Sequence, residues 1–252
     1  MGTLVVVRHG QASLFAADYD VLSPRGVAQA EFLGAHLREH GPHPQLVFTG
    51  PAKRQRDTAR LCGEAYAAAG RPWPEAVVVP ELDEHDAFGL VARAVPRLQH
   101  DPEIAALARA ASDAVDHKQR SGSFQRLFEA VMGRWLRGEL DGLDAPGEPP
   151  IESWPSFAAR VQRGLERMLD HDAPGIRMIA FTSVGPIAVL LQRALATGDR
   201  ESFQAAWRTR NTAMTTFVFS RARERGTTTA AFTLDGFNAL PHLPDASAHT
   251  FR

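Results

Sequence analysis

Short apolar runs mark the strands of this chain, and the first of them precedes its most informative residues. Residues 4–7 read Leu-Val-Val-Val. Such an unbroken run, rich in β-branched residues, favours a strand buried on both faces of a parallel sheet. Arg8, His9 and Gly10 follow where this strand ends, and Gly10 permits a sharp turn. Because open parallel sheets bind ligands at the carboxyl ends of their strands, we expect function at this turn.

Strand and helix patterns alternate over most of the remaining chain. Further strands are predicted at residues 45–49, 77–79, 177–181, 214–220 and 227–233. Helices are predicted at residues 24–40, about 53–69, 153–171, 184–196 and 201–208. The first helix has Ser23 as its N-cap and ends at Gly41. This alternation is typical of a three-layer α/β fold, with a mainly parallel sheet and helices on both faces.

One long stretch, residues 88–140, is predicted to be helical and interrupts the alternation. One face of it carries an apolar stripe at i, i+3, i+4, i+7 and i+11 spacing, formed by Phe124, Leu127, Phe128, Val131 and Trp135. We expect this stripe to fix an inserted helical cap onto the sheet. Residues 141–150, rich in Gly and Pro, are the returning loop. The chain is therefore predicted to be one domain over residues 1–252, with a cap at about 87–150.

Composition narrows the class of protein. A chain of 252 residues with 44% hydrophobic residues can bury a large core, and its net charge of -1 provides no general basic field. Nucleic acid and membrane are therefore not expected partners. The single cysteine, Cys62, is predicted to be a small buried residue, and its being alone suits a reducing compartment. The sequence has no signal-type segment and no apolar run near the ~20 residues of a membrane helix, so we expect a cytoplasmic protein.

Three of the predicted strand-to-helix turns should gather at one edge of the sheet. They are residues 8–10, 49–51 and 182–185, and the helix after the second begins with Lys53 and Arg54. Helix amino termini present unpaired N–H groups and attract phosphate. Neutral imidazole is a nucleophile, and a guanidinium can bind two phosphate oxygens at once. The pattern favours phosphoryl transfer at His9.

Several motifs, spread over almost the whole chain, resemble those of the histidine phosphatase superfamily, the clan of phosphoglycerate mutase and histidine acid phosphatases, and within it a cytoplasmic bacterial branch. They are Val7-Arg8-His9-Gly10-Gln11, Leu22-Ser23-Pro24-Arg25-Gly26 with Gln29-Ala30, Lys53-Arg54 with Thr58-Ala59, Leu82-Asp83-Glu84, the turn from Phe181 to Gly185, Asn211-Thr212, and Phe237-Asn238 with His242-Leu243. Their order and spacing make the resemblance specific.

The resemblance implies hydrolysis of a phosphomonoester through a phosphohistidine. His9 would be the nucleophile, and Glu84 would give a proton to the leaving oxygen and later activate water. The phosphate contacts expected are Arg8, Arg54, Ser183, Gln11 and Val184. The scheme needs no metal and no cofactor, and its expected partner is a small phosphorylated substrate. The need for neutral His9 and protonated Glu84 predicts a mildly acidic to neutral optimum, and the sequence leaves a homodimer open.

Ser183 departs from the family pattern, which usually has a second histidine at this position. A serine brings no positive charge, and losing a charge-assisted hydrogen bond of about 1.5–3 kcal/mol would slow the reaction by roughly 10- to 150-fold. Ser183→His should raise turnover if this missing charge limits the rate. The departure also leaves open a catalytically retired protein that only binds a phosphorylated ligand.

Three other functions are less favoured by the sequence. Residues 12–20 lack the tryptophan-and-asparagine pattern of phosphoglycerate mutases, which argues against a mutase. Ser183, Asp235 and His242 occur in the chain order of an α/β-hydrolase esterase, but Phe181 stands where its nucleophile elbow needs glycine. Residues 83–86 contain four possible metal ligands, yet adjacent side chains point in different directions.

Overall fold

The computed structural model describes residues 1–12, 20–143, 147, 150–171, 173–224 and 227–251. The chain divides into two compact units. A sheet unit comprises Met1–Glu84 and Arg160–Arg252, and a helical unit comprises His85–Ala159. The insertion predicted at about 87–150 lies within the helical unit. The boundary between the units falls inside helix α6 (Trp154–Leu169).

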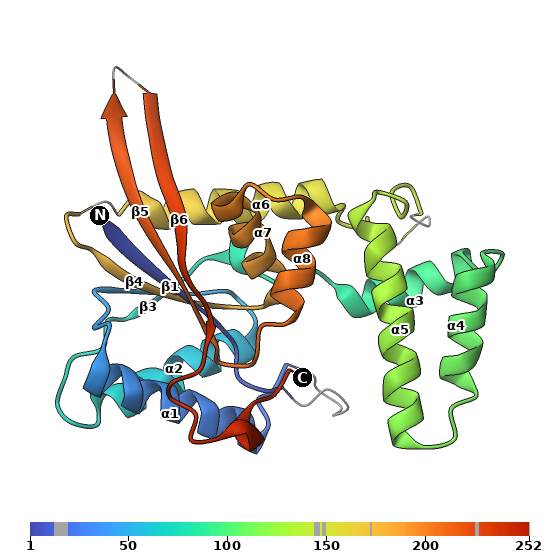
Figure 1. Cartoon of the computed structure of the whole chain (residues 1–252), viewed down its shortest axis with the longest axis horizontal. Coiled ribbons are helices and arrows are strands. Elements are labelled where there is room, and N and C mark those ends of the chain that lie inside the picture. Colours follow the sequence, from blue (N-terminus) through green and yellow to red (C-terminus); the bar gives the residue numbers. More distant parts are fainter. Residues whose placement is uncertain (13–19, 144–146, 148–149, 172, 225–226, 252) are drawn as a thin grey trace. The chain divides into compact units, whose positions relative to one another are not determined.

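The sheet unit contains a mixed sheet of six strands in the order β3-β2-β4-β1-β5-β6 (Figure 1). The strands are β1 (Gly2–Arg8), β2 (Leu46–Thr49), β3 (Ala76–Val78), β4 (Arg177–Thr182), β5 (Met214–Glu224) and β6 (Thr227–Ala239). The first four strands in this order pair in parallel, whereas β5 pairs antiparallel with both β1 and β6. The α/β fold with a mainly parallel sheet is therefore confirmed.

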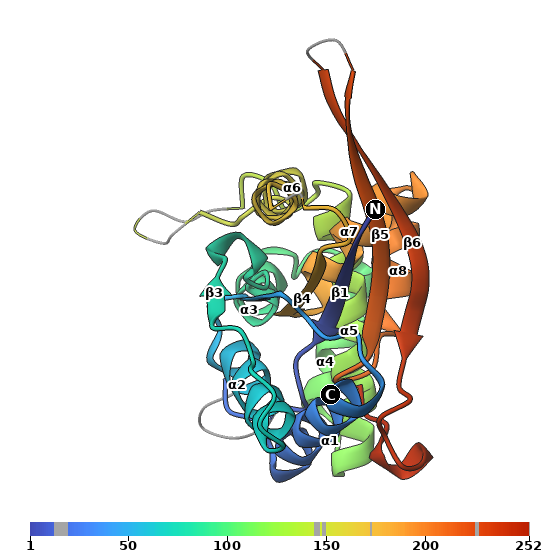
Figure 2. The same ribbon diagram turned by 90° about the vertical axis from the view of Figure 1, so that its left-hand side faces the viewer.

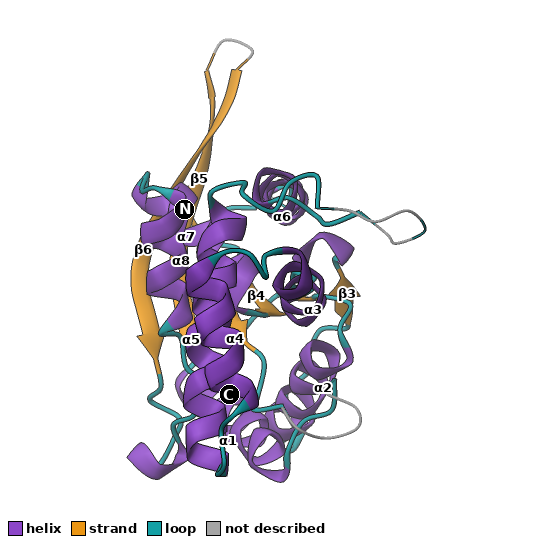
Figure 3. Ribbon diagram, turned by 90° about the vertical axis from the view of Figure 1, so that its right-hand side faces the viewer, coloured by secondary structure: helices purple, strands orange, loops and turns teal. Residues whose placement is uncertain are grey.

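The last two strands extend further than their apolar pattern predicts. β1 pairs with β5 only as far as Phe219, opposite Gly2, while β5 and β6 stay paired to Glu224 and Thr227. The two strands therefore continue alone as a long ribbon (Figure 3). Within β6, Gly236 lies opposite Thr216 between two shifts of register. A glycine in a strand often marks such a bulge.

The helices of the sheet unit have bounds close to the predicted ones. They are α1 (Pro24–His40), α2 (Lys53–Ala67), α7 (Val184–Leu195), α8 (Asp199–Trp207) and the last part of α6, with short 3-10 turns at Pro80–Leu82 and Ala246–Ala248. The predicted caps of α1 are confirmed. The Ser23 side chain accepts a hydrogen bond from the Gly26 N–H, and Gly41 has a φ of 75° that favours glycine.

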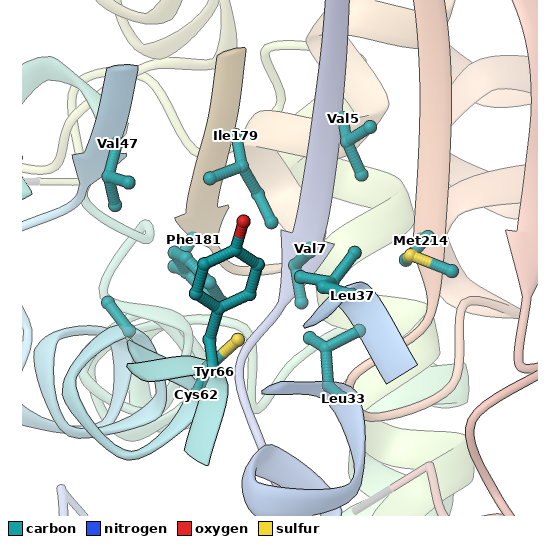
Figure 4. Packing of buried hydrophobic residues seen from close by; sticks show 11 residues of the cluster. Val5, Val7, Leu33, Leu37, Val47, Cys62, Tyr66, Ile179, Phe181 and Met214 are labelled. Carbon is teal, nitrogen blue, oxygen red and sulfur yellow. The ribbon is translucent and has the colours of Figure 1, made fainter. Parts of the chain in front are cut away.

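One hydrophobic core lies between the sheet and the α1–α2 pair. Alternate residues of β1, Val5 and Val7, point to the same face and pack with Leu33, Leu37 and Cys62 of the two helices (Figure 4). The intervening β1 residues are also buried, and α7 covers the opposite face of the sheet (Figure 2). Burial on both faces explains why β1 is an unbroken apolar run. As predicted, Cys62 is a fully buried residue.

The helical unit contains three helices where the sequence predicts one helical stretch. They are α3 (Ala87–Arg97), α4 (Pro102–Ser112) and α5 (His117–Leu136). Asp101 and Asp116 cap α4 and α5 through their carboxylates, and these caps divide the stretch. The predicted stripe lies on α5, where Trp135 packs edge-on against Trp154. The aromatic side chains of the stripe contact others of the helical unit. The role predicted for the stripe, fixing a cap onto the sheet, stays a prediction.

None of the helices in the described part of the chain is long and apolar enough to cross a membrane. The cytoplasmic location expected from the sequence stays a prediction.

Candidate active site

His9 lies directly after β1 and is held there by its backbone. The His9 N–H donates to the Thr182 carbonyl at 2.8 Å, and the Asn211 side-chain amide donates to the His9 carbonyl at 3.0 Å. Thr182 is the last residue of β4, so the turn is tied to the neighbouring strand. The His9 residue is 4% exposed. The predicted nucleophile therefore sits at the carboxyl edge of the parallel strands, in a buried and fixed position.

The hydrogen bonds of the His9 ring determine which nitrogen carries the lone pair. Nδ1 lies 2.8 Å from the Gly10 carbonyl, which can only accept, so Nδ1 holds the hydrogen. Nε2 then has the lone pair, which accepts a hydrogen bond from the Nε of Arg54 at 3.3 Å. Burial, and then the charges of Arg54 and Arg8, hold the pKa of His9 well below its usual value, while Gly10 and Glu84 oppose this shift. The ring is therefore a neutral imidazole, which nucleophilic attack requires.

Two buried arginines stand beside this imidazole, as the sequence predicts. Arg8 ends β1, and its Nη1 donates to the Thr209 carbonyl at 2.6 Å. Arg54 lies in the first turn of α2, and its guanidinium is anchored by Asp20 at 2.8 Å through Nη1. Two guanidinium groups in a buried site provide the charge that a phosphoryl group needs.

Asp20 is a residue of this site that sequence reasoning missed. Its carboxylate also accepts from the backbone N–H groups of Lys53 and Arg54, at 2.7 and 3.1 Å. A carboxylate at a helix amino terminus is stabilised by such unpaired N–H groups and by the helix dipole. Asp20 thus caps α2 and orients Arg54 at the same time. Asp20 and Arg54 are 34 positions apart in the sequence, which explains why no local pattern indicated this pair.

Glu84 caps the second helix of the site, α7. Both of its carboxylate oxygens lie 3.1 Å from the Gly185 N–H, one residue into the helix. Its effect on the pKa of His9 places it within electrostatic reach of the imidazole. The sequence predicts open helix amino termini that attract phosphate, but α2 and α7 each hold a carboxylate of the chain itself. Phosphate binding at this edge would therefore depend chiefly on the arginine side chains.

Ser183 is buried and hydrogen-bonded to Gln55, a second residue that sequence reasoning missed. The Gln55 amide donates to the Ser183 Oγ at 2.8 Å and to the Leu82 carbonyl at 3.4 Å, while its oxygen accepts from the Ala52 N–H. Gln55 thereby connects the start of α2 with the segments that carry Glu84 and Ser183. A glutamine three residues after the N-cap is the local signal of such a back-bond.

The other two predicted phosphate contacts have structural positions. The Gln11 N–H donates to the Gln29 side chain at 3.0 Å, and its side-chain oxygen accepts from the Ser23 hydroxyl at 3.0 Å. Gln11 thus links the His9 turn to the start of α1. Val184 is the first residue of α7, where backbone N–H groups lack acceptors within the helix. That either residue contacts phosphate stays a prediction.

The alternative Ser-Asp-His site has no bond between its serine and its histidine among the described residues. Ser183 is bonded to Gln55, whereas the His242 Nε2 lies 3.0 Å from the Thr212 hydroxyl. Because that hydroxyl donates its own hydrogen to the Asn211 carbonyl, it accepts from Nε2–H. Within the described ranges, no group of three or more His, Cys, Asp or Glu residues could hold a metal ion.

His242 should make the fold sensitive to acid. Burial, with smaller effects of His36 and His249, lowers its pKa to about 3. In the unfolded chain its pKa is near the ordinary ~6.5, so the unfolded state takes up a proton first as the pH falls. Stability due to the neutral ring is complete above about pH 6.5 and is lost progressively toward pH 3. Thermal unfolding should show a melting temperature that falls over this range, and His242→Gln, which keeps a donor but cannot titrate, should reduce the slope. An unchanged slope would contradict this role.

The sequence comparison gives a match at the amino-terminal part of the chain. Residues 4–90 match the model of the histidine phosphatase superfamily, branch 1. The chain is similar to the 2,3-bisphosphoglycerate-dependent phosphoglycerate mutase of Nocardia farcinica, with 39% identity over 77 residues that cover 28% of this chain and 30% of the mutase. The corresponding mutase of Bradyrhizobium sp. (strain ORS 278) is 32% identical over 93 residues, which cover 34% and 45%. The aligned segment spans less than half of either mutase.

Solved structures resemble the whole chain. A mycobacterial glucosyl-3-phosphoglycerate phosphatase has a TM-score of 0.55 and 19% identity, covering 94% of this chain and 98% of its own. The phosphoserine phosphatase of Entamoeba histolytica has a TM-score of 0.56 and 17% identity, covering 96% and 99%. At such identities the likeness shows a shared fold. Residues 4–90 therefore resemble the histidine phosphatase superfamily, and the chain shares the fold of these two phosphatases.

Proposed function

We propose that this protein hydrolyses a small phosphomonoester through a phosphohistidine at His9, without a metal ion. The observation that supports this most is the state of the imidazole, neutral and with the lone pair of Nε2 beside Arg54. The two arginines supply the positive charge that a metal ion provides in other phosphatases. Two proteins of similar fold are named as phosphatases of phosphorylated small molecules, which fits this substrate class.

The proposed reaction has two steps at the same phosphorus. In the first, His9 Nε2 bonds to phosphorus while the bond to the ester oxygen breaks, and Glu84 gives that oxygen a proton so that an alcohol leaves. In the second, Glu84 takes a proton from water, whose oxygen attacks phosphorus and breaks the bond to Nε2. Inorganic phosphate leaves, and both residues regain their initial protonation states. Arg8 and Arg54 offset the charge of the phosphoryl oxygens in both steps.

A second candidate is a protein that binds a phosphorylated ligand without turnover. The observation behind it is Ser183, which is 1% exposed and bonded to Gln55, at the position where the family usually has a second histidine. A buried cationic site without that histidine would still attract a phosphate. This candidate predicts saturable binding of a phosphomonoester by the native protein and no release of phosphate.

Turnover of an aryl phosphate, beside the matching aryl carboxylate ester and with chelator present, separates these functions. Release of phosphate alone supports the phosphatase. Binding of the aryl phosphate without its cleavage supports the ligand-binding protein, and cleavage of the carboxylate ester alone would favour an esterase. Dependence of phosphate release on an added divalent metal would contradict the metal-free scheme.

Ser183→His is expected to lower turnover, although it restores the usual family residue. Ser183 is buried against the Gln55 amide, so an imidazole must displace that amide and disturb the start of α2. Overpacking of this kind typically costs about 1–3 kcal/mol. Shortening Gln55 as well should recover part of the loss, and Ser183→Ala is the matched control for losing the hydroxyl alone. A rise in kcat for Ser183→His by itself would show that the missing charge, rather than space, limits the rate.

A further inference from the structure

The turn that carries His9 is held by three buried side chains from distant parts of the sheet unit. Asn211 donates to the His9 carbonyl, Thr58 accepts from the Gly10 N–H, and Gln29 accepts from the Gln11 N–H, each at 3.0 Å. Every consecutive residue of the turn thus has one backbone group bound by a side chain. Thr58 is itself fixed, because its hydroxyl donates to the Arg54 carbonyl at 2.6 Å.

Two of these three side chains are joined by one hydroxyl from the carboxyl-terminal tail, the segment that follows β6. Thr250 Oγ1 accepts from the Gln29 side-chain amide at 2.9 Å and donates to the Asn211 side-chain oxygen at 2.9 Å. The Thr250 carbonyl also accepts from the Asn211 N–H at 2.8 Å. Gln29, Asn211 and Thr250 are all buried. The bonds form a closed ring that runs from Gln11 through Gln29, Thr250 and Asn211 back to His9.

The chemistry of this ring restricts the residue at position 250. A hydroxyl has one hydrogen to donate and lone pairs to accept, and Thr250 uses both functions. The orientation of both amides follows, because the oxygen of Gln29 faces Gln11 and the nitrogen of Asn211 faces His9. Without the hydroxyl, the Asn211 oxygen would lose its donor, and a buried amide with a missing partner is free to turn.

The backbone beside Asn211 requires such support. Thr212 has a φ of 59°, a conformation that a β-branched residue rarely adopts. Its N–H donates to the Arg8 carbonyl at 2.9 Å, so this strained residue is directly attached to the end of β1. Strain of this kind persists only where the surroundings determine the conformation fully, and it is common at functional sites.

We propose that Thr250 is a positioning residue for His9: its hydroxyl fixes the Gln29 and Asn211 side chains that hold the His9 turn in the geometry for attack. This rests on the proposed function, since the geometry that matters is that of the attacking Nε2. The tail would then complete the site without touching the substrate.

Thr250→Val tests this, because valine keeps the shape and removes the hydroxyl. Thr250→Ser keeps the hydroxyl, and Thr250→Ala is a second deletion should the valine disturb folding. The matched control is Thr215→Val, because Thr215 is a buried threonine whose hydroxyl has no hydrogen-bond partner among the described residues. Two readouts are needed: kcat and KM for an aryl phosphate, and the NMR signals of nitrogen-labelled His9, assigned by their loss in His9→Ala.

Thr250→Val and Thr250→Ala should lower kcat by about tenfold or more with little change in KM, because misplacing a reacting atom slows chemistry rather than binding. Both should also shift or broaden the His9 ring signals, whereas Thr250→Ser and Thr215→Val should behave like the native protein. If the imidazole signals of His9 were identical to the native ones in both deletion variants, the proposal would be overturned. The imidazole signals report on the position of His9 even if neither the native protein nor any variant releases phosphate. The absence of phosphate release would contradict the proposed phosphatase activity and leave the test of Thr250 valid.

Discussion

His9→Ala should abolish phosphate release and leave the fold intact. The loss should be roughly 10³-fold or more, because no other described side chain of the site takes over the role of a nucleophile whose lone pair faces Arg54. Folding should survive, since the bonds that tie this turn to Thr182 and Asn211 are made by the backbone of His9. Turnover of an aryl phosphate and urea unfolding measure the two quantities.

His40→Ala is the control for removing a histidine at all. His40 is the last residue of α1, and its side chain is 65% exposed, so its loss should change neither turnover nor stability measurably. If the His9→Ala variant kept native turnover, His9 would have no part in the mechanism. Loss of turnover together with a much lower urea concentration at the unfolding midpoint would instead show that His9 is needed for the fold, contrary to our expectation.

Glu84→Gln should give the second largest effect, and its size should depend on the substrate. Glutamine can still accept from the Gly185 N–H but cannot give a proton to the leaving oxygen. General acid catalysis contributes typically ~10²–10⁴-fold, and the contribution is greatest for an alkoxide, which leaves poorly without a proton. We therefore expect a loss in this range for an alkyl phosphate and a much smaller one for the phosphate of an acidic phenol.

Glu81→Gln is the matched control for the same chemical change three residues away. Glu81 pairs with Arg167 at 2.8 Å, on the surface side of the segment that carries Glu84. Its replacement should leave the rates for both phosphates unchanged. Equal losses for the alkyl and the aryl phosphate in Glu84→Gln would show that Glu84 supports the fold of the site and does not protonate the leaving group.

The Ser183 position illustrates how the structure changes the meaning of a sequence feature. From the sequence, the serine is a missing charge, with a deficit of about 1.5–3 kcal/mol. In the structure it is the acceptor of a bond from Gln55, which also reaches the start of α2 and the Leu82 carbonyl. Replacing Ser183 with histidine would therefore change the packing of the site as well as its charge.

Local sequence was sufficient to predict an element wherever the physical signal for that element acts within a few residues. The unbroken apolar run indicated β1, and Ser23 with Pro24 indicated the first turn of α1, because burial on two faces and capping each act within a few residues. The parallel arrangement then placed His9, Arg54 and Ser183 near one edge of the sheet. In the helical unit, by contrast, periodicity alone did not separate the three helices, and the local caps Asp101 and Asp116 that divide them were signals that sequence reasoning missed.

The α/β class, the bounds of most elements and a set of candidate residues for chemistry could be predicted from the pattern of the chain alone. How those residues are held depends on the fold. Asp20 anchors Arg54 across 34 residues, and Thr250 reaches Gln29 across 221. The fold also decided that His9 is neutral, since that depends on burial and on two neighbouring guanidinium groups. The physical reason is that periodicity and capping act within a few residues, whereas burial, charge and hydrogen-bond partners depend on segments that only folding brings together.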